Sequence, residues 1–443
     1  MDPNCNGQIT PVIGGIAGSK ADASEPGARA VRLWPYSARR ARAHAIATAI
    51  VLWIGLTITF AAGAGNRSIA GPIKGPDFLQ FYTMGSLVRT GRTAALYDVN
   101  AFHRAQVDLV PESAPELYPT VYPPQVAFVF APFSALSFRQ ALVLWSAITI
   151  ALFFVIVRSA WRAVANDLPD SVLVGAAAAA FPPFWSLVLH GQATILILAA
   201  FWAGWIALER KRPYLAGVAF GLLLIKPQFA IPLAVVAVVC GEWPMIAGAA
   251  TSIAIQVAGV VMLLGRPVLK AYLTFVPVML QHQDLLEPKP FQSHSLRALT
   301  RLAPAWIGVP MWAILCAVVL SYTVRVWRSA APPRVRLGMI VIASVLVNPH
   351  LIVYDATVLA LPLLWFGAYV QERRAPIAAT YWTAVYWSFV TLLAPTALIV
   401  GVQVSVLLLM WMAVTIARAT VADAGPAPSQ LERGLPEPFG LRA

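Results

Sequence analysis

Charged side chains are scarce in this sequence. Lys, Arg, Asp and Glu together make up 12% of its 443 residues, whereas about a quarter is usual in soluble domains. Hydrophobic residues make up 59%, and the mean hydropathy is +0.71. This balance excludes an ordinary soluble domain and predicts an all-α polytopic membrane protein. With roughly 20 residues in each span, the chain can cross a membrane about twelve times.

Cysteines are few, and the short motifs of many enzymes are absent. Cys5, Cys240 and Cys316 follow no metal-binding spacing and indicate no disulfide framework. The chain has no Asp-x-Asp motif to hold the metal of a nucleotide-sugar site, and no phosphate-binding loop, serine-hydrolase or zinc-protease motif. We therefore predict no resident metal and no cofactor. A divalent cation beside a substrate phosphate is compatible with this hypothesis but is not required by it.

Positive charge dominates, with a formal net charge of +13. In a soluble protein this excess would indicate nucleic acid. Here Arg and Lys mostly lie between apolar segments, so the positive-inside rule explains them better. The arginines from Arg29 to Arg42 place the N-terminus in the cytoplasm. We expect membrane lipids and no nucleic acid as partners, in a bacterial inner (plasma) membrane with both chain termini cytoplasmic.

A single membrane domain is predicted over residues 44–417. It lies between two disordered cytoplasmic tails, 1–43 and 418–443. The segments at about 65–138 and 265–304 are too long for simple turns, so we predict two long outer loops that contain short interfacial helices. Twelve spans are expected: three near 44–64, 140–157 and 171–189, seven more up to Glu372, and the last two near 377–395 and 398–417.

Three of these spans have unusual features. Pro182 and Pro183 should bend the third span. Only 13 residues separate Arg212 from Lys226, and 11 separate Arg336 from Asn348. At about 1.5 Å per residue, the longer of these covers about 20 Å of a hydrocarbon core about 30 Å thick. Short, Pro-interrupted spans of this kind indicate a polar recess and a binding site.

Most side chains that could do chemistry fall on the outer side in this topology. They are His103, His190, His282, His294, His350, Asp77, Asp98, Asp108, Asp284 and Glu287. A reaction is therefore expected at the outer, periplasmic face. Asp77, just past the first span, is suited to act as a general base toward an acceptor hydroxyl. The alternative is that it caps a helix beginning near Phe78.

Basic and polar residues near the recess are candidates for substrate binding. Lys226 is costly at membrane depth unless it is paired or useful, so it is suited to neutralise a phosphate; otherwise it is a snorkelling anchor. His350 is suited to bind phosphate or a sugar hydroxyl, or else pairs with Asp355. His190 and Gln192 are expected to line the same recess or to be structural.

Two further residues carry weaker signals. Tyr122, which precedes two prolines, is more typical of a residue that shapes a loop than of one that contacts substrate. Arg297 shares a predicted helix face with Arg301 and is suited to meet a phosphate or lipid headgroups.

These residues lie in short motifs that together resemble the GT-C membrane glycosyltransferases, and most closely glycosyltransferase family 87. The motifs, spread over roughly residues 65–365, are Gly75-Pro-Asp77-Phe-Leu-Gln-Phe-Tyr82, Leu96-Tyr97-Asp98, Tyr122-Pro-Pro124, Ala131-Pro-Phe133, His190-Gly-Gln192, Ala216-Gly217, Leu224-Ile-Lys226-Pro-Gln228, Asn348-Pro-His350 and Tyr354-Asp355. That family includes polyprenol-phosphate-mannose-dependent α-(1→2)-mannosyltransferases.

The resemblance implies a GT-C-like bundle that uses a polyprenyl-phosphate sugar donor. It also implies an Asp in the first outer loop as the general base of an inverting transfer, a position that Asp77 matches. His350 resembles the family's active-site His. Tyr82 and Gln228, within the matching motifs, are taken as substrate-binding candidates. The acceptor is expected to be a lipid or a glycan, and the sugar mannose or another hexose or pentose.

Three other functions fit parts of the sequence. A transporter or flippase of lipid-linked sugars predicts a polar path to both faces and repeat symmetry, and neither is visible. A non-catalytic subunit of an envelope-assembly complex would use its outer loops for docking. A different lipid-linked transferase, such as an oligosaccharide ligase or polymerase, would favour Arg-rich outer loops.

Overall fold

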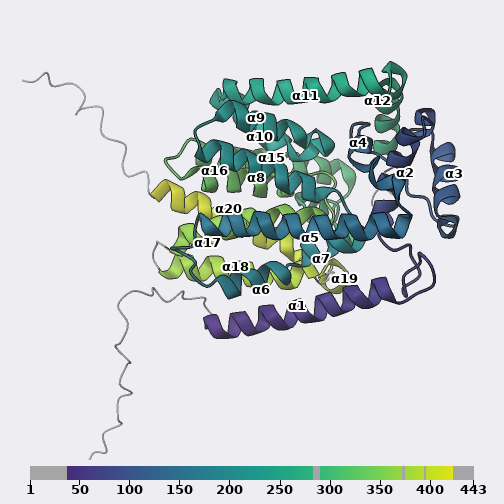
Figure 1. The fold of residues 1–443 in the computed structure, drawn as a ribbon. Helices are drawn as coiled ribbons and strands as arrows, with labels where there is room; N and C mark the ends of the chain where they lie inside the picture. Colours follow the sequence, from purple (N-terminus) through teal and green to yellow (C-terminus); the bar gives the residue numbers. More distant parts are fainter. Residues whose placement is uncertain (1–36, 283–289, 372–374, 394–395, 423–443) are drawn as a thin grey trace, which may run out of the picture. The chain divides into compact units, whose positions relative to one another are not determined.

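The computed structural model describes residues 37–282, 290–371, 375–393 and 396–422, and regular structure in these residues is helical (Figure 1). All of them belong to one contact unit. The long helices run alongside one another, and helices of the first predicted loop gather at one end. The predicted all-α polytopic membrane fold is confirmed.

Each predicted span coincides with a helix or a helix pair. These are α1 (Ala38–Ala61), α5 (Phe138–Arg162), α6 (Ser171–Ala179) with α7 (Pro182–His190), α8 (Thr194–Glu209), α9 (Pro213–Gly221), α10 (Ile231–Cys240), α11 (Trp243–Leu263), α15 (Ala305–Trp327), α16 (Pro333–Leu346), α17 (Ala360–Gln371), α18 (Ala375–Leu393) and α20 (Val404–Ala422). Within the described residues, five helical segments are long and apolar enough to cross a membrane, or six if the bent pair α6–α7 is one span. The other predicted spans coincide with shorter helices.

The two ends of the membrane domain differ from the prediction by a few residues. Helix α1 begins at Ala38, so the last residues of the predicted tail 1–43 are helical. Ser37 begins this helix because its Oγ accepts a hydrogen bond from the Arg40 backbone N–H at 3.3 Å. At the other end α20 continues to Ala422 rather than ending at 417. The remainder of both tails lies outside the described residues.

The predicted bend in the third span is confirmed. Helices α6 and α7 meet at an angle of 43°. The prolines Pro182 and Pro183 occupy the first turn of α7, where their missing N–H groups would have no intrahelical partner in any case. The bend allows α7 to end at His190, next to the polar residues described below.

Both outer loops contain short helices, as predicted. The first loop has α2 (Pro76–Arg89), α3 (Val99–Leu109) and α4 (Val126–Phe130), and the second has α12 (Arg266–Gln281), a 3-10 turn at Pro290–Gln292 and α14 (Leu296–Thr300). Helix α2 is not an interfacial helix, because every side chain from Phe78 to Leu87 is buried within the protein. Asp284 and Glu287 lie outside the described residues.

The two loops meet each other. The Tyr97 ring lies 5.4 Å from the Tyr272 ring and 5.7 Å from the Phe275 ring, measured between ring centroids. In Figure 1 α12 turns away from the end of α11 and runs toward α2 and α4. The outer segments therefore form one assembly, which holds the end of α2 in place.

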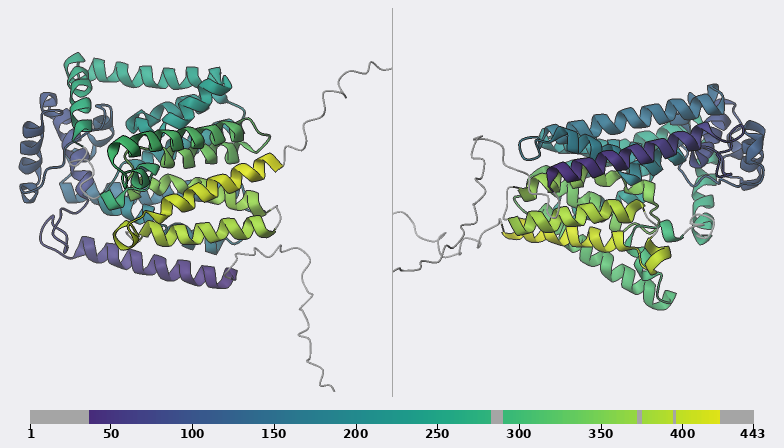
Figure 2. Two further views of the ribbon diagram at one scale, coloured as in Figure 1. Left: turned by 180° about the vertical axis from the view of Figure 1, so that it is seen from behind. Right: turned by 90° about the horizontal axis from the view of Figure 1, so that it is seen from below.

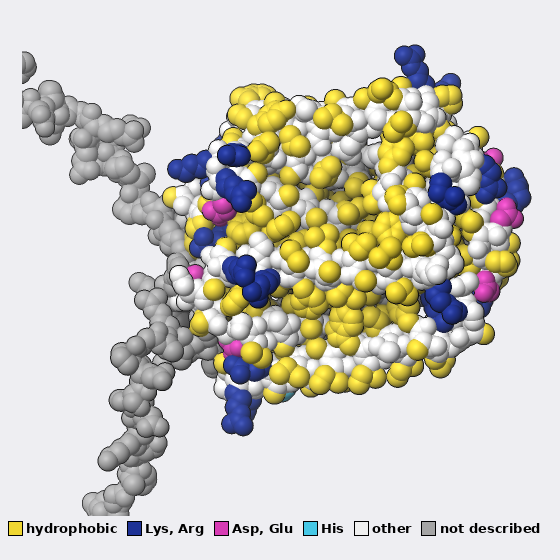
Figure 3. Space-filling view, in the orientation of Figure 1, with side chains coloured by type: hydrophobic (Ala, Val, Ile, Leu, Met, Phe, Trp, Pro, Cys, Tyr) yellow, Lys and Arg dark blue, Asp and Glu magenta, His cyan; other side chains and the backbone are white. Residues whose placement is uncertain are grey.

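Apolar side chains cover the outside of the helical bundle. In Figure 3 Lys and Arg gather toward two opposite ends, and the surface between them is largely hydrophobic. Large exposed apolar side chains lie on α1, α5, α11 and α15. Such an apolar surface is expected to face lipid. Figure 2 shows α1 along the lower edge of the bundle in the left view and across its near face in the right view, and few of its side chains are buried.

Candidate active site

Asp77 lies in the first turn of α2, on the outer side of the bundle in the predicted topology. The helix begins at Pro76, and its N-cap residue is Gly75, in the left-handed conformation with φ of 62°. Asp77 therefore does not cap the helix, and the alternative interpretation of this residue is wrong. Its half-buried carboxylate lies at the positive end of the helix dipole.

Gln192 holds the Asp77 carboxylate. Its side-chain Nε2 donates to Asp77 Oδ2 over 3.1 Å. The preceding residue, Gly191, has φ of 67°, and a Cβ atom there would lie 2.6 Å from the Cβ of Phe78. Only glycine fits this close approach of α7 to α2. The His-Gly-Gln motif therefore uses its glycine to bring the glutamine against the helix that carries Asp77.

The other end of the Gln192 amide is also fixed. Its Oε1 accepts from the Tyr122 hydroxyl at 2.9 Å and from the Ala193 backbone N–H at 2.8 Å. Burial raises the pKa of the Tyr122 phenol to about 12, so this hydroxyl stays protonated and donates. Tyr122 does more than shape its loop, because its side chain belongs to a polar network that ends on Asp77.

Lys226 lies on the other side of Tyr122. Its Nζ is 5.5 Å from the centre of the Tyr122 ring and 5.2 Å from that of Tyr354. It donates to Asp355 Oδ1 over 2.5 Å and to Thr194 Oγ1 over 3.0 Å. Its side chain is 7% exposed. Lys226 is therefore neither a snorkelling anchor nor a free cation, because Asp355 compensates its charge.

Asp355 is shared by two partners. The same Oδ1 that binds Lys226 accepts from the Thr194 hydroxyl at 2.6 Å. Asp355 faces Lys226, and the alternative pairing of Asp355 with His350 stays a prediction. A buried lysine, threonine and aspartate thus form a second polar group next to the Asp77–Gln192–Tyr122 network.

The two candidate histidines lie on segments that lead into this region. His190 ends α7, where its Nδ1 is 2.8 Å from the Ser186 carbonyl oxygen, and its ring is 5.4 Å from that of Tyr354. His350 is half-buried, and its backbone N–H donates to Asn348 Oδ1 over 3.0 Å. Tyr354, which contacts both Lys226 and His190, lies four residues after His350.

Three predicted substrate-binding residues make other contacts. The Tyr82 hydroxyl donates to the Leu136 carbonyl oxygen over 2.7 Å, and its ring packs on Phe138. This contact fastens α2 to the start of α5. Arg297 lies over the Trp312 ring of α15 at 6.0 Å. Gln228 is half-buried in the 3-10 turn Pro227–Phe229. None of these contacts joins the network around Asp77.

The second outer loop is anchored beside His350 by a buried histidine. The His294 backbone N–H donates to the Leu351 carbonyl oxygen over 3.1 Å, and its Nδ1 is 2.7 Å from Ser405 Oγ on α20. Burial lowers the pKa of His294 to about 3, so the ring is neutral. His294 therefore supports the segment that carries His350 and is itself closed off from substrate.

Sequence reasoning missed Thr194 and Tyr354. Thr194 follows the His-Gly-Gln motif by two residues, but a threonine at the start of an apolar helix is too common to single out. Tyr354 directly precedes Asp355 in a short motif, and the motif alone indicates no role for its side chain. Among the residues that the structure describes, no three His, Cys, Asp or Glu side chains are grouped to hold a metal ion.

The comparison with protein families decides the class of this protein. The family model described as glycosyltransferase family 87 matches residues 120–349, slightly more than half of the chain. The chain belongs to glycosyltransferase family 87. As a member of this family it is a membrane glycosyltransferase. No match was found among the curated proteins or the solved structures.

The family 87 match covers only some of the residues of the candidate active site. It includes Tyr122, Gln192, Thr194 and Lys226. Asp77 lies before the matched region, and the segment from His350 to Asp355 follows it. The hydrogen bond between Gln192 and Asp77 is therefore what connects the matched region to the first outer loop.

Proposed function

We propose that this family 87 enzyme transfers a hexose or pentose, such as mannose, from a polyprenyl-phosphate donor to a lipid or glycan acceptor. The reaction takes place at the outer face of a bacterial plasma membrane. Family membership supports sugar transfer. The carboxylate of Asp77, held by Gln192 on the outer end of the bundle in the predicted topology, is the observation that carries the mechanism.

In the proposed reaction Asp77 is the general base. It takes the proton of the acceptor hydroxyl as the hydroxyl oxygen attacks the anomeric carbon of the donor sugar. A new glycosidic C–O bond forms while the bond from the anomeric carbon to the phosphate oxygen breaks. The lipid phosphate leaves with the electron pair of that bond. Attack and departure occur on opposite faces, so the configuration at the anomeric carbon inverts.

The surroundings of Asp77 fit this role. Gln192 donates a hydrogen bond to Asp77 Oδ2 and leaves Oδ1 for the acceptor hydroxyl. The start of α2 places the positive end of the helix dipole at this carboxylate. Because the Gln192 amide is fixed at both ends, the carboxylate is oriented before the acceptor arrives.

We propose Lys226 and His350 as the groups nearest the departing phosphate. A positive charge there stabilises the negative charge that grows in the transition state. Lys226 is paired with Asp355, so a donor phosphate would share the lysine with that carboxylate. The proposal requires no metal, and it is compatible with a divalent cation on the phosphate.

The test is the Asp77→Asn variant of the full chain, purified and placed in lipid nanodiscs. Turnover is measured by mass spectrometry with a panel of polyprenyl-phosphate hexoses and pentoses and a membrane-lipid extract as acceptor. General bases contribute about 10²- to 10⁴-fold to rate, and we expect a loss of that order. Wild-type turnover in this variant would exclude Asp77 as the base.

Asp98→Asn is the matched control. Asp98 also follows the first span, but its carboxylate caps α3 by accepting from the Ala101 N–H at 2.8 Å, and asparagine caps nearly as well. We expect full activity. The sugar and acceptor are identified from the lipids and glycans of a deletion strain, where loss of one hexose or pentose names both. A transporter or a docking subunit would tolerate Asp77→Asn.

A further inference from the structure

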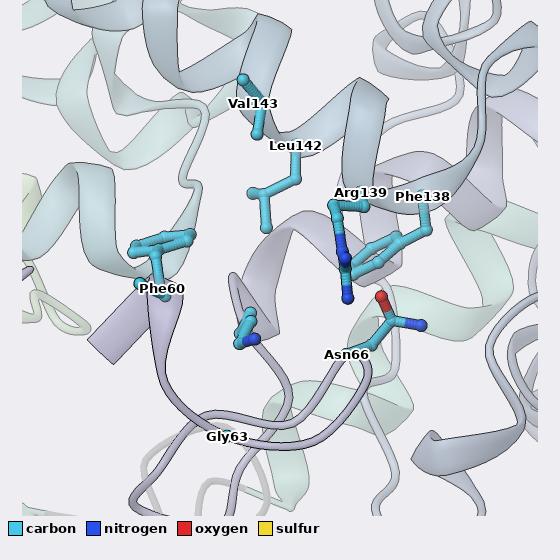
Figure 4. Close-up of a pocket in the computed structure, with 9 residues that line it drawn as sticks. Phe60, Gly63, Asn66, Phe138, Arg139, Leu142 and Val143 are labelled. Carbon is cyan, nitrogen blue, oxygen red and sulfur yellow. The ribbon is translucent and has the colours of Figure 1, made fainter. Parts of the chain in front are cut away.

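A pocket lies beside the start of α2, away from the Lys226 group. Its volume is about 340 Å³. It is bounded by the last turn of α1, by the loop from Gly63 to Lys74 and by the first turns of α5. In Figure 4 Phe60 and Leu142 lie on facing sides, and the Arg139 side chain points toward Asn66. The proposed mechanism gives this pocket no role.

Two cations at the pocket share a single uncharged partner. Lys74 Nζ donates to the Gly65 carbonyl oxygen over 3.2 Å, and Arg139 Nη2 donates to the same oxygen over 2.9 Å. Lys74 is 9% exposed. In the part of the chain that the structure describes, neither side chain has a carboxylate within salt-bridge distance.

The acidic residues that contact this loop are already engaged, and Glu116 pairs with Arg67 at 2.9 Å. Glu112 Oε1 accepts from the backbone and side-chain N–H groups of Asn66, each at 3.3 Å. A buried ammonium without a counter-ion is costly. Two cations that converge on one carbonyl oxygen are therefore arranged for an anion that can accept hydrogen bonds from both, and phosphate has this chemistry.

The remainder of the pocket is apolar. Its walls include Phe60, Ala61, Phe138, Leu142 and Val143. Val143 is 60% exposed, and exposed apolar side chains continue along both helices, with Leu144 and Ile148 on α5 and Ile54 and Ile58 on α1. A ligand with an anionic head and a hydrocarbon chain would satisfy both halves of the site at once.

The pocket is in direct contact with the element that carries Asp77. Leu142 packs so closely on Gly75 that a Cβ atom at residue 75 would lie 2.5 Å from Leu142 Cδ1. The same leucine carbon would lie 3.3 Å from a Cβ atom at Gly191. Leu142 therefore forms one wall of the pocket and also packs against two glycines of the candidate active site. Gly75 lies two residues before Asp77, and Gly191 lies directly before Gln192.

We propose that this pocket binds the phosphate-bearing head of a membrane lipid. Lys74 and Arg139 hold the phosphate, and the hydrocarbon chain lies against Phe60, Leu142 and Val143. This phosphate is separate from the donor phosphate assigned above to Lys226 and His350, and the proposal rests on the proposed function only in treating this lipid as the acceptor or the released carrier of the transfer reaction. The shared ligand chemistry is a lipid phosphate, which a polyprenyl phosphate or a phospholipid such as phosphatidylinositol can supply.

Binding is measured on the purified full chain by native mass spectrometry and by ligand-induced shifts of the melting temperature. The probes are a polyprenyl phosphate, phosphatidylinositol and inorganic phosphate, each added alone. We expect one of the two lipids to bind, and inorganic phosphate to bind at least tenfold more weakly. The lipid that binds identifies the source of the phosphate. Equal binding of inorganic phosphate would overturn the assignment to a lipid.

Two exposed positions test the pocket without disturbing the core. Arg139→Gln removes an exposed cation, and Val143→Trp fills the apolar end while both cations stay. We expect each to weaken lipid binding at least tenfold. Arg210→Gln, an exposed arginine at the end of α8, is the control and should bind normally. Unchanged lipid binding in both pocket variants would overturn the proposal.

The same measurement separates this inference from the proposed function. Asp77→Asn leaves the pocket residues intact, so it should retain lipid binding whatever its effect on turnover. Lost binding in Arg139→Gln with an active Asp77→Asn variant would support the pocket and contradict the proposed base. Normal lipid binding in Arg139→Gln together with lost turnover in Asp77→Asn would support Asp77 as the base and contradict the proposed lipid site.

Discussion

The Lys226 ammonium lies 2.5 Å from Asp355 Oδ1 inside the protein. Removing one partner leaves the other charge buried without compensation, which costs about 3–5 kcal/mol. We therefore expect Lys226→Met and Asp355→Asn each to lower the melting temperature of the purified protein markedly.

The double variant Lys226→Met/Asp355→Asn is the control for this pair. Both charges are gone, so it should be more stable than either single variant. The measurement is thermal unfolding followed by tryptophan fluorescence in one detergent at one pH. Additive losses in the double variant would show that the two residues do not act as a pair.

Gln192 is expected to orient the Asp77 carboxylate, to which its side-chain amide donates. Gln192→Ala removes a hydrogen bond to a charged group, a loss of about 1.5–3 kcal/mol, so turnover should fall by about 10- to 100-fold. Gln192→Glu places a second carboxylate beside the first. Like charges disfavour ionisation, so the acidic limb of the pH–rate profile should move to higher pH.

Gln228→Glu makes the same chemical change at a half-buried residue for which no contact with the Asp77 network is seen. Its pH–rate profile should match the wild type. A shift of equal size in both variants would mean that the effect comes from general charge and not from contact with Asp77.

His294 should make stability depend on acidity. Burial lowers its pKa from 6.5 to about 3, so between these values the unfolded chain binds a proton that the folded chain does not. Stability is then complete above pH 6.5 and decreases as the pH falls toward 3, by on the order of 1 kcal/mol per pH unit. Melting temperatures between pH 7 and pH 4 measure this effect.

His294→Gln lacks the titrating ring and should lose less stability over the same pH range, although it is less stable at pH 7. An identical decrease in both proteins would assign the acid sensitivity to other groups. The comparison is independent of turnover, so it tests the loop anchor on its own.

The predicted membrane orientation can be tested with single cysteines in a background from which Cys5, Cys240 and Cys316 have been removed. A membrane-impermeant thiol reagent added to intact cells should label Asp108→Cys, on exposed α3, and should not label Arg210→Cys. After the membrane is permeabilised, both should be labelled. The reverse pattern would place Asp77 on the cytoplasmic side and contradict the proposed donor.

Local sequence patterns were sufficient to predict the long helices. Each predicted apolar segment coincides with a helix or a helix pair, and the two prolines at 182 and 183 lie at the bend. These features depend on neighbouring residues only. The start of α1 at Ala38 was missed because arginines were taken as a tail, although a long arginine side chain fits a helix that extends beyond the bilayer.

The pairs that form the site depend on contacts between distant segments. Asp77 and Gln192 are 115 residues apart, and Lys226 and Asp355 are 129 apart. Sequence predicted Asp77, Gln192 and Lys226 as site candidates, but it could not predict that Lys226 is neutralised by a carboxylate. The length of the first outer loop suggested interfacial helices, whereas α2 is buried and satisfies its polar side chains internally, as when Thr83 donates to the Leu79 carbonyl oxygen.

Helix α1 packs along α6 and α7 but buries few of its own side chains. Its buried side chains are Leu52 and Leu56, and the indoles of Trp53 and Trp185 tie it to α6 and α7. Swinging this helix outward would uncover little core, and it would open the space beside Phe60 directly to the bilayer. The hydrocarbon tail of the proposed donor would then be able to enter sideways from the bilayer, with no need to thread through an opening end-first.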